Sequence, residues 1–229
     1  MFYFAGTRKP NFSDIQKIDY NEYWNRRGFV INAKLKEREI IILDFIPQKY
    51  RVLDVGCGNS LLPIKLKEKG VSVEVADISD IVLKGYGAQG IESVCVDLEN
   101  PSDISLKGKY NFIILSEVLE HLTNPEEVVA VLKKSTDQLI ITIPNSAFYR
   151  FRLHLLFCGR FFTQWVYHPS EHVRYWSHTD FLEWLVSRGL TVTRSEASNG
   201  LSILGIPLFR FWPNLFGHQI CYFVKTNEL

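Results

Sequence analysis

Between Lys49 and Pro144, short apolar runs rich in β-branched residues alternate with stretches that have helical spacing. Five of the runs are predicted to be strands, and three of the stretches between them are predicted to be helices. Because strands that are apolar on both faces need a covering layer on each side, this alternation predicts a parallel sheet between two layers of helices. The predicted strands span 50–55, 71–76, 93–96, 110–115 and 138–143, and the predicted helices span 61–69, 79–85 and 125–134.

The segment before this core is predicted to be mostly helical. It covers 11–47 and has an amphipathic pattern over 32–46 that Pro47 ends, and we expect it to form an N-terminal lid. A chain of 229 residues is long enough to bury one core without a disulfide or a metal ion. We therefore predict a single domain over 1–229.

Aromatic residues gather after the core, and we predict an irregular aromatic cap over 146–175. The predicted elements beyond it are a helix capped by Ser177 or Thr179 and ended by Gly189, a strand at 189–196, a loop at 197–217 and a strand at 218–226. A loop of that length in a compact domain is usually functional or part of an interface.

Charge balance and cysteine spacing exclude several classes of protein. Lys and Arg total 26 and Asp and Glu total 25, which removes the electrostatic argument for a nucleic-acid partner. The sequence contains no run of about 18 uncharged apolar residues, so no transmembrane segment is predicted. The first residues lack the basic and apolar regions of a signal peptide, and the four cysteines form no CxxC pair. We therefore expect a cytoplasmic protein.

A glycine-rich turn follows the first predicted strand, with glycines at positions 56 and 58. Glycines there permit positive φ and let backbone N–H groups approach a ligand closely. A dinucleotide fingerprint, as in an NAD-dependent oxidoreductase, needs a third glycine where Leu61 stands, so that pattern fails. The alternative is the S-adenosylmethionine (SAM) loop (D/E)xGxGxG, in which Asp54 supplies the acid and Ser60 replaces the last glycine.

Acidic and polar residues at the ends of successive predicted strands favour SAM. SAM carries an ammonium and a sulfonium but no pyrophosphate, so an acid at position 54 suits it electrostatically. Asp77 ends the second strand about 20 residues after the first glycine, the spacing of a ribose-binding acid. Asp97 ends the third strand, where a polar group can meet the adenine, and the polar loop 116–122 follows the fourth. Open α/β sheets bind ligands at this edge.

The motifs VLDVGCG, VADIS, VDLEN and IILSEVLEHL resemble, in order and spacing, those of class I SAM-dependent methyltransferases of the type 11 branch, over roughly 50–144. The resemblance implies a Rossmann-like three-layer α/β sandwich with a seven-stranded mixed sheet whose last strand, 218–226, is antiparallel. It also implies methyl transfer to a small-molecule acceptor. The residues implied to contact SAM are Asp54, Gly56, Gly58, Asp77, Ile78, Asp97, Leu98 and, through its backbone, Ser116.

A second, looser resemblance covers the part of the chain after the core. The stretches IPNSAFYRFRLHLLFCGRF and EHVRYWSHTDFLEWLVSRGL are similar to the MetW-type methionine-biosynthesis proteins. This resemblance implies an alternative function, in which the chain is a non-catalytic partner of a homoserine acyltransferase.

The catalytic candidate is His121, which lies where the sulfonium and an acceptor would meet. Histidine is the side chain whose ordinary pKa best suits a general base at neutral pH. The alternative is that Glu120 and His121 hold the loop by hydrogen bonds. Methyl transfer is an in-line displacement, and alignment of the reactants can supply much of its acceleration without a base.

The run HPSEH at 168–172 matches the HxxEH pattern of a zinc protease. Pro169 disfavours the helix that this chemistry requires, so we predict no metal site. His172, Arg174 and Tyr175 are instead predicted to bind the acceptor. The alternative is a loop that holds the next helix.

Two further surfaces are predicted from aromatic clusters. Basic and aromatic residues interleave over 148–161, as in a site for an anionic or aromatic acceptor, in a membrane-surface or partner helix, or in a cap packed on the sheet. We also predict a possible homodimer, through exposed aromatic side chains at Phe209, Phe211, Trp212 and Phe216.

Overall fold

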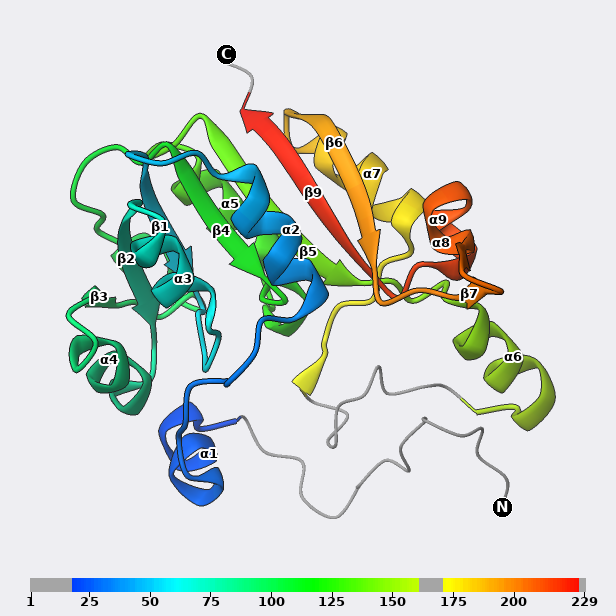
Figure 1. The fold of residues 1–229 in the computed structure, drawn as a ribbon, viewed down its shortest axis with the longest axis horizontal. Helices are drawn as coiled ribbons and strands as arrows, with labels where there is room; N and C mark the ends of the chain where they lie inside the picture. Colours follow the sequence, from blue (N-terminus) through cyan, green and yellow to red (C-terminus); the bar gives the residue numbers. More distant parts are fainter. Residues whose placement is uncertain (1–17, 161–170, 227–229) are drawn as a thin grey trace.

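The computed structural model describes residues 18–160 and 171–226, and it contains the predicted seven-stranded mixed sheet (Figure 1). The strand order is β3-β2-β1-β4-β5-β9-β6, and β9 runs antiparallel to both β5 and β6. The predicted antiparallel last strand is therefore confirmed. The strands are β1 Arg51–Val55, β2 Ser72–Asp77, β3 Glu92–Cys95, β4 Phe112–Ser116, β5 Gln138–Pro144, β6 Leu190–Ser198 and β9 Gln219–Thr226.

Helices cover both faces of the sheet (Figure 1). One face packs against α2, α3 and α4, and the other packs against α5 and α7. The helices are α1 Tyr20–Arg27, α2 Glu37–Phe45, α3 Leu62–Glu68, α4 Asp80–Gly87, α5 Pro125–Leu132, α6 Tyr149–Cys158, α7 His178–Ser187, α8 Leu208–Phe211 and α9 Pro213–Phe216, with short 3-10 turns at Pro101–Asp103 and Leu119–His121.

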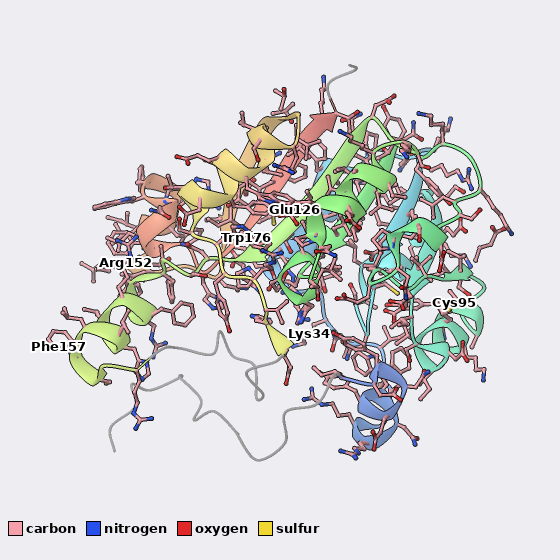
Figure 2. The ribbon with its side chains drawn as sticks, turned by 180° about the vertical axis from the view of Figure 1, so that it is seen from behind. Lys34, Cys95, Glu126, Arg152, Phe157 and Trp176 are labelled. Atoms are coloured by element: carbon pink, nitrogen blue, oxygen red, sulfur yellow. The ribbon has the colours of Figure 1, made fainter. Side chains whose placement is uncertain are left out.

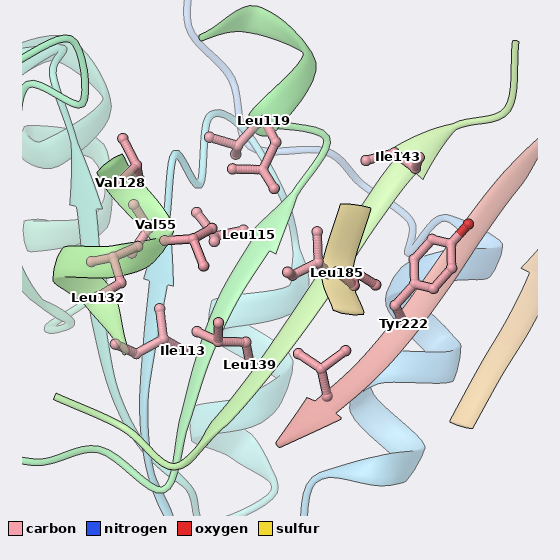
Figure 3. Close-up of a cluster of buried hydrophobic side chains, with 14 of the residues drawn as sticks. Val55, Ile113, Leu115, Leu119, Val128, Leu132, Leu139, Ile143, Leu185 and Tyr222 are labelled. Carbon is pink, nitrogen blue, oxygen red and sulfur yellow. The ribbon is translucent and has the colours of Figure 1, made fainter. Parts of the chain in front are cut away.

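Side chains of the central strands alternate between two cores. Leu53, Ile113 and Ile141 face the core under α5 and α7, which Figure 3 shows in close-up. Their neighbours Val52 and Ile114 face the core under α2 and α3. Since successive side chains of a strand point to opposite faces, a strand buried on both faces must be apolar throughout, as the sequence pattern indicates.

The structure corrects three predictions outside the central strands. The helix predicted over 32–46 is shorter, because α2 starts at Glu37, where the Glu39 carboxylate accepts a hydrogen bond from the Lys36 N–H at 2.8 Å. The cap 146–175 is not irregular throughout, since it contains α6. The predicted loop 197–217 contains the hairpin of β7 (Ser202–Ile203) and β8 (Ile206–Pro207), and the short helices α8 and α9.

The apolar residues of 197–217 are not uniformly exposed. Phe209, predicted to be exposed, is buried against the core under α5 and α7, and Phe216 packs partly against the same core. Phe211 and Trp212 are exposed. Within 18–160 and 171–226, every helix is too short or too polar to cross a bilayer.

Candidate functional site

The strand order reverses between β1 and β4, and the helices that follow these two strands pack on opposite faces of the sheet. The turns after β1, β2 and β4 therefore meet at the carboxyl edge, beside the switch point where open α/β sheets bind ligands. The sequence-predicted residues Asp54, Asp77 and Ser116 all stand at the ends of these strands.

The glycine turn after β1 has the backbone conformation that the sequence predicted. Gly56 and Gly58 have φ of +66° and +51°. The Gly56 N–H donates to the carbonyl of Ala76 at 2.7 Å, and the Gly58 N–H donates to the carboxylate of Asp77 at 3.0 Å. The turn is thus tied to the end of the neighbouring strand β2.

Ser60, at the place of the third glycine of the SAM pattern, is accommodated without strain. Its φ is not positive, so a glycine is not required there. Its hydroxyl accepts a hydrogen bond from the Leu62 N–H at 3.0 Å and donates to the Glu39 carboxylate at 3.0 Å. The departure from the pattern therefore adds contacts to the start of α3.

The Asp77 carboxylate is held by backbone donors on both sides. Besides Gly58, it accepts a hydrogen bond from the Ser79 N–H at 3.0 Å. Burial raises the pKa of Asp77, and the backbone donors oppose that shift. The next residue, Ile78, is exposed and can lie over a planar ring.

Asp54 is a carboxylate almost fully removed from water, at 2% exposure, and its side chain makes no hydrogen bond within the described part of the chain. Burial and the nearby Glu39 and Asp77 carboxylates raise the pKa of Asp54 to about 8, with Arg38 opposing. A cationic ligand beside Asp54 would favour its charged form.

Asp97 and Leu98 lie at the end of β3. The Asp97 carboxylate accepts hydrogen bonds from the Glu99 N–H at 2.9 Å and the Asn100 amide at 2.7 Å, which makes it a turn residue in this structure. Leu98 packs partly against the core under α5 and α7.

A polar network crosses the ends of β4, β5 and β9. The Ser116 hydroxyl lies 3.1 Å from that of Thr142, and it accepts a hydrogen bond from the Arg38 guanidinium at 3.2 Å. Glu117, at φ +58°, accepts hydrogen bonds from Thr142 and from the Gln219 amide. The network holds the start of the 116–122 loop in place.

His121 and His172 come together although 50 residues separate them in the chain. Their ring centroids lie 4.6 Å apart at 81°, and the Nδ1–H of His121 donates to the carbonyl of Glu171. Burial lowers the pKa of both, in His172 to about 3 with His121 contributing. Glu120 is buried beside them, and burial and Glu117 raise its pKa. His168, the first residue of the HxxEH run, lies outside the described residues.

Of the other two predicted acceptor residues, Arg174 turns away from His172 and Tyr175 stays beside it. The Arg174 guanidinium donates to the carbonyl of Thr123 and forms a 3.9 Å ion pair with Glu126, so it ties its segment to the start of α5. The exposed Tyr175 ring lies 6.4 Å from that of His172. Of the three, Arg174 fits the alternative role of holding the loop.

Sequence reasoning missed two residues at this edge. Arg38 points from α2 into the site, although charged residues in an amphipathic helix are usually solvated. Tyr20 of α1 is near enough to Glu171, Asp77 and Glu120 that their charges, with burial, raise its pKa. No local signal marked either residue.

The curated relatives are methyltransferases and a methionine-biosynthesis protein. The chain is 27% identical over 52% of its length to the "bifunctional methionine biosynthesis protein MetXA/MetW" of Rhodopirellula baltica, and 30% identical over 53% to the "tRNA 5-carboxymethoxyuridine methyltransferase" of Escherichia coli. The matches span 20% and 50% of these two relatives.

Solved structures show the same fold. The magnesium protoporphyrin IX methyltransferase of Synechocystis, solved with bound SAH, superposes with a TM-score of 0.61 at 16% identity, over 91% of this chain and 98% of that one. The fold is therefore that of the Rossmann-like methyltransferases.

The family model "Methionine biosynthesis protein MetW" matches residues 36–224. That range contains the glycine turn, six strands of the sheet with most of the seventh, β9, and the segment from Glu171 to Tyr175. The chain therefore belongs to the MetW family.

Proposed function

We propose that this protein binds SAM at the carboxyl edge of the sheet and transfers its methyl group to a small-molecule acceptor. The observation that carries the proposal is Asp54, a buried carboxylate without a hydrogen-bond partner in the described part of the chain, beside a turn of two positive-φ glycines. The ammonium of SAM would compensate this charge, whereas a pyrophosphate would be repelled.

The remaining contacts follow from the order of the strands. Asp77 would bridge the ribose hydroxyls, since backbone donors already hold its carboxylate at the end of β2. Ile78 and Leu98 would flank the adenine, with Asp97 at its polar edge, and the backbone of Ser116 would face the methionine part. The methyltransferase relatives and the fold support this assignment.

The acceptor would lie on the side of His121, His172 and Tyr20. Transfer is an in-line displacement, so the main task of these residues is to hold the acceptor oxygen, nitrogen or carbon in line with the methyl group. α1 would act as a lid, because Asn21 accepts a hydrogen bond from the Ser79 hydroxyl at 2.8 Å and Trp24 packs near Gly58. We place the reaction in the cytoplasm and favour a small molecule over tRNA, since the net charge is only +1.

Calorimetry with SAM and S-adenosylhomocysteine tests the proposal. We expect micromolar binding, and we expect Asp77→Ala to weaken it by about 10-fold or more, because a charged hydrogen-bond acceptor is lost. Asp137→Ala is the matched control, since this exposed carboxylate lies at the opposite edge of the sheet. An absence of binding to both compounds, or tight binding of NADH in a fluorescence titration, would contradict the proposal.

A second candidate function is that of a non-catalytic partner of a homoserine acyltransferase. Leu156 and Phe157 on α6 are exposed by 72% and 70%, and Figure 2 shows Phe157 at the outer end of this helix. Two exposed apolar side chains on one helix suit a protein interface, as would Phe211 and Trp212, the remaining exposed candidates for a homodimer. A pull-down that recovers the acyltransferase from wild type but not from Phe157→Ser, with no methylation of added acceptors, would favour this function.

A further inference from the structure

The carboxylate of Glu120 is an unexplained group. Its side chain is 1% exposed, and both oxygens are buried without a hydrogen-bond partner in the described part of the chain. Buried polar atoms are nearly always hydrogen-bonded, because an unpaired one loses its hydration without compensation. A missing partner in such a place indicates an ion, a water or a ligand that occupies the site in the functional protein.

Two imidazoles face this carboxylate. One potential ligand atom each from Glu120, His121 and His172 lie within 4.8 Å of one another. The rings of the two histidines pack against each other edge to face. One carboxylate and two imidazoles on a single centre are the donor set of many metal sites with open coordination positions.

The backbone fixes how these ligands point. His121 donates its Nδ1–H to the Glu171 carbonyl, so its Nε2 carries the lone pair that can bind a cation. Metal-binding histidines usually donate their second N–H in this way. The N–H groups of Val173 and Arg174 donate to the Glu120 carbonyl at 2.9 and 3.1 Å, which holds His172 over the 3-10 turn.

We propose that Glu120, His121 and His172 form a binding site for one divalent transition-metal ion, such as Zn²⁺, Co²⁺ or Mn²⁺. The positive charge of the ion would compensate the buried carboxylate of Glu120. The two imidazoles would bind the ion in their neutral form. The sequence prediction of no metal site considered His168 and His172 as a helical pair, whereas the structure brings His172 to a different partner.

The open coordination positions suggest a role, and this part rests on the proposed methyl transfer. Three protein ligands leave room for oxygen atoms of a bound molecule. Tyr20 lies near both Glu120 and Asp77, so we place the ion between the predicted ribose site and the acceptor. The acceptor class that fits is a molecule with a hydroxyl or carboxylate oxygen that can bind the ion directly.

Cobalt binding tests the site without any assay of activity. Tag-free protein is treated with EDTA, dialysed, and titrated with Co²⁺ by calorimetry and visible absorption. We expect one Co²⁺ per chain, with d–d bands between about 500 and 650 nm that report nitrogen ligands. Glu120→Gln and His172→Gln should each weaken binding by about 100-fold or more, because a ligand of the ion is lost.

Two matched variants control for loss of folding and for Co²⁺ binding to histidines outside the proposed site. Glu74→Gln alters a buried carboxylate bonded to Tyr110 at the far edge of the sheet, and His178→Gln removes a buried imidazole bonded to Tyr222. Both should bind Co²⁺ like wild type, and circular dichroism should show all four variants folded.

Two results would overturn the site. Wild type would bind no Co²⁺, or the Glu120 and His172 variants would bind Co²⁺ as tightly as wild type does. SAM binding by the EDTA-treated wild type is measured in parallel. Metal binding without SAM binding would support the metal site and contradict the proposed function. SAM binding without metal binding would support the proposed function and contradict the metal site.

Discussion

At Gly56, the addition of a single methyl group should disturb the site strongly. Its φ of +66° disfavours any side chain, and a Cβ there would lie 2.7 Å from Cγ2 of Val118. We expect Gly56→Ala to lower the free energy of unfolding by about 2–4 kcal/mol, from backbone strain plus a steric clash, as measured by urea denaturation. SAM binding should fall with it, because the turn must shift.

Gly189→Ala separates the two causes of that loss. Gly189 has a φ of +71° with nothing within 4 Å of the added Cβ, so it should cost only the strain, about 1–2 kcal/mol. Val118→Ala combined with Gly56→Ala should recover part of the difference. Equal losses in the two single variants would show that the contact with Val118 is unimportant.

At the scale of elements, Asn145 joins three segments that follow β5. Its amide donates to the carbonyls of Pro213, Asn214 and Gly217, at 2.8 to 3.2 Å. Its carbonyl accepts hydrogen bonds from the N–H groups of Ala147 and His178. The starts of α6 and α7 and the turn after α9 therefore depend on one fully buried side chain.

We expect Asn145→Ala to destabilise the protein by about 2–4 kcal/mol, since several buried backbone groups lose their partner. Asn145→Asp should be no better despite its equal shape, because it replaces the donor with a negative charge beside three carbonyls. Asn100→Ala, an exposed site, should change stability by less than about 1 kcal/mol. Thermal and urea unfolding measure all three, and a tolerated Asn145→Asp would show that the donor bonds matter little.

At the scale of the molecule, buried histidines and buried carboxylates change the stability of the fold with pH in opposite directions. Burial lowers the pKa of His218 to about 4, with Arg38 and Arg150 adding to the shift and Glu117 opposing it. The unfolded chain therefore binds this proton near pH 6.5 while the folded chain does not, so stability decreases as pH falls from 6.5 to 4. Asp54, whose pKa is raised to about 8, has the reverse effect. The folded chain keeps this proton while the unfolded chain loses it near pH 4, so stability decreases as pH rises from about 4 to 8.

The contribution of His218 is measured as the difference between two stability profiles. His218→Phe keeps a ring against Phe148 and Phe151 but removes the titrating group. Wild type should lose about 2–3 kcal/mol relative to this variant between pH 6.5 and 4. Parallel profiles across that range would contradict the assigned shift.

The central strands were predicted to within about two residues, because a strand buried on both faces leaves a continuous apolar run. The glycine turn was predicted for a similar reason, since positive φ selects glycine at two places and not at Ser60. The chain after β5 was predicted less well. α6 has exposed apolar residues on its outer side, so its helical spacing was masked.

The sequence by itself determined the strands of the parallel core and the acidic and glycine residues at the carboxyl edge, because these depend on local patterns a few residues long. The antiparallel last strand was predicted through the family resemblance, and the order of the strands came from the structure. Only the tertiary structure decided that Arg38 enters the site and that Glu120, His121 and His172 share one centre. Contacts across about 50 or more residues depend on how loops cross the sheet edge, and a single sequence has no periodic signal for such crossings.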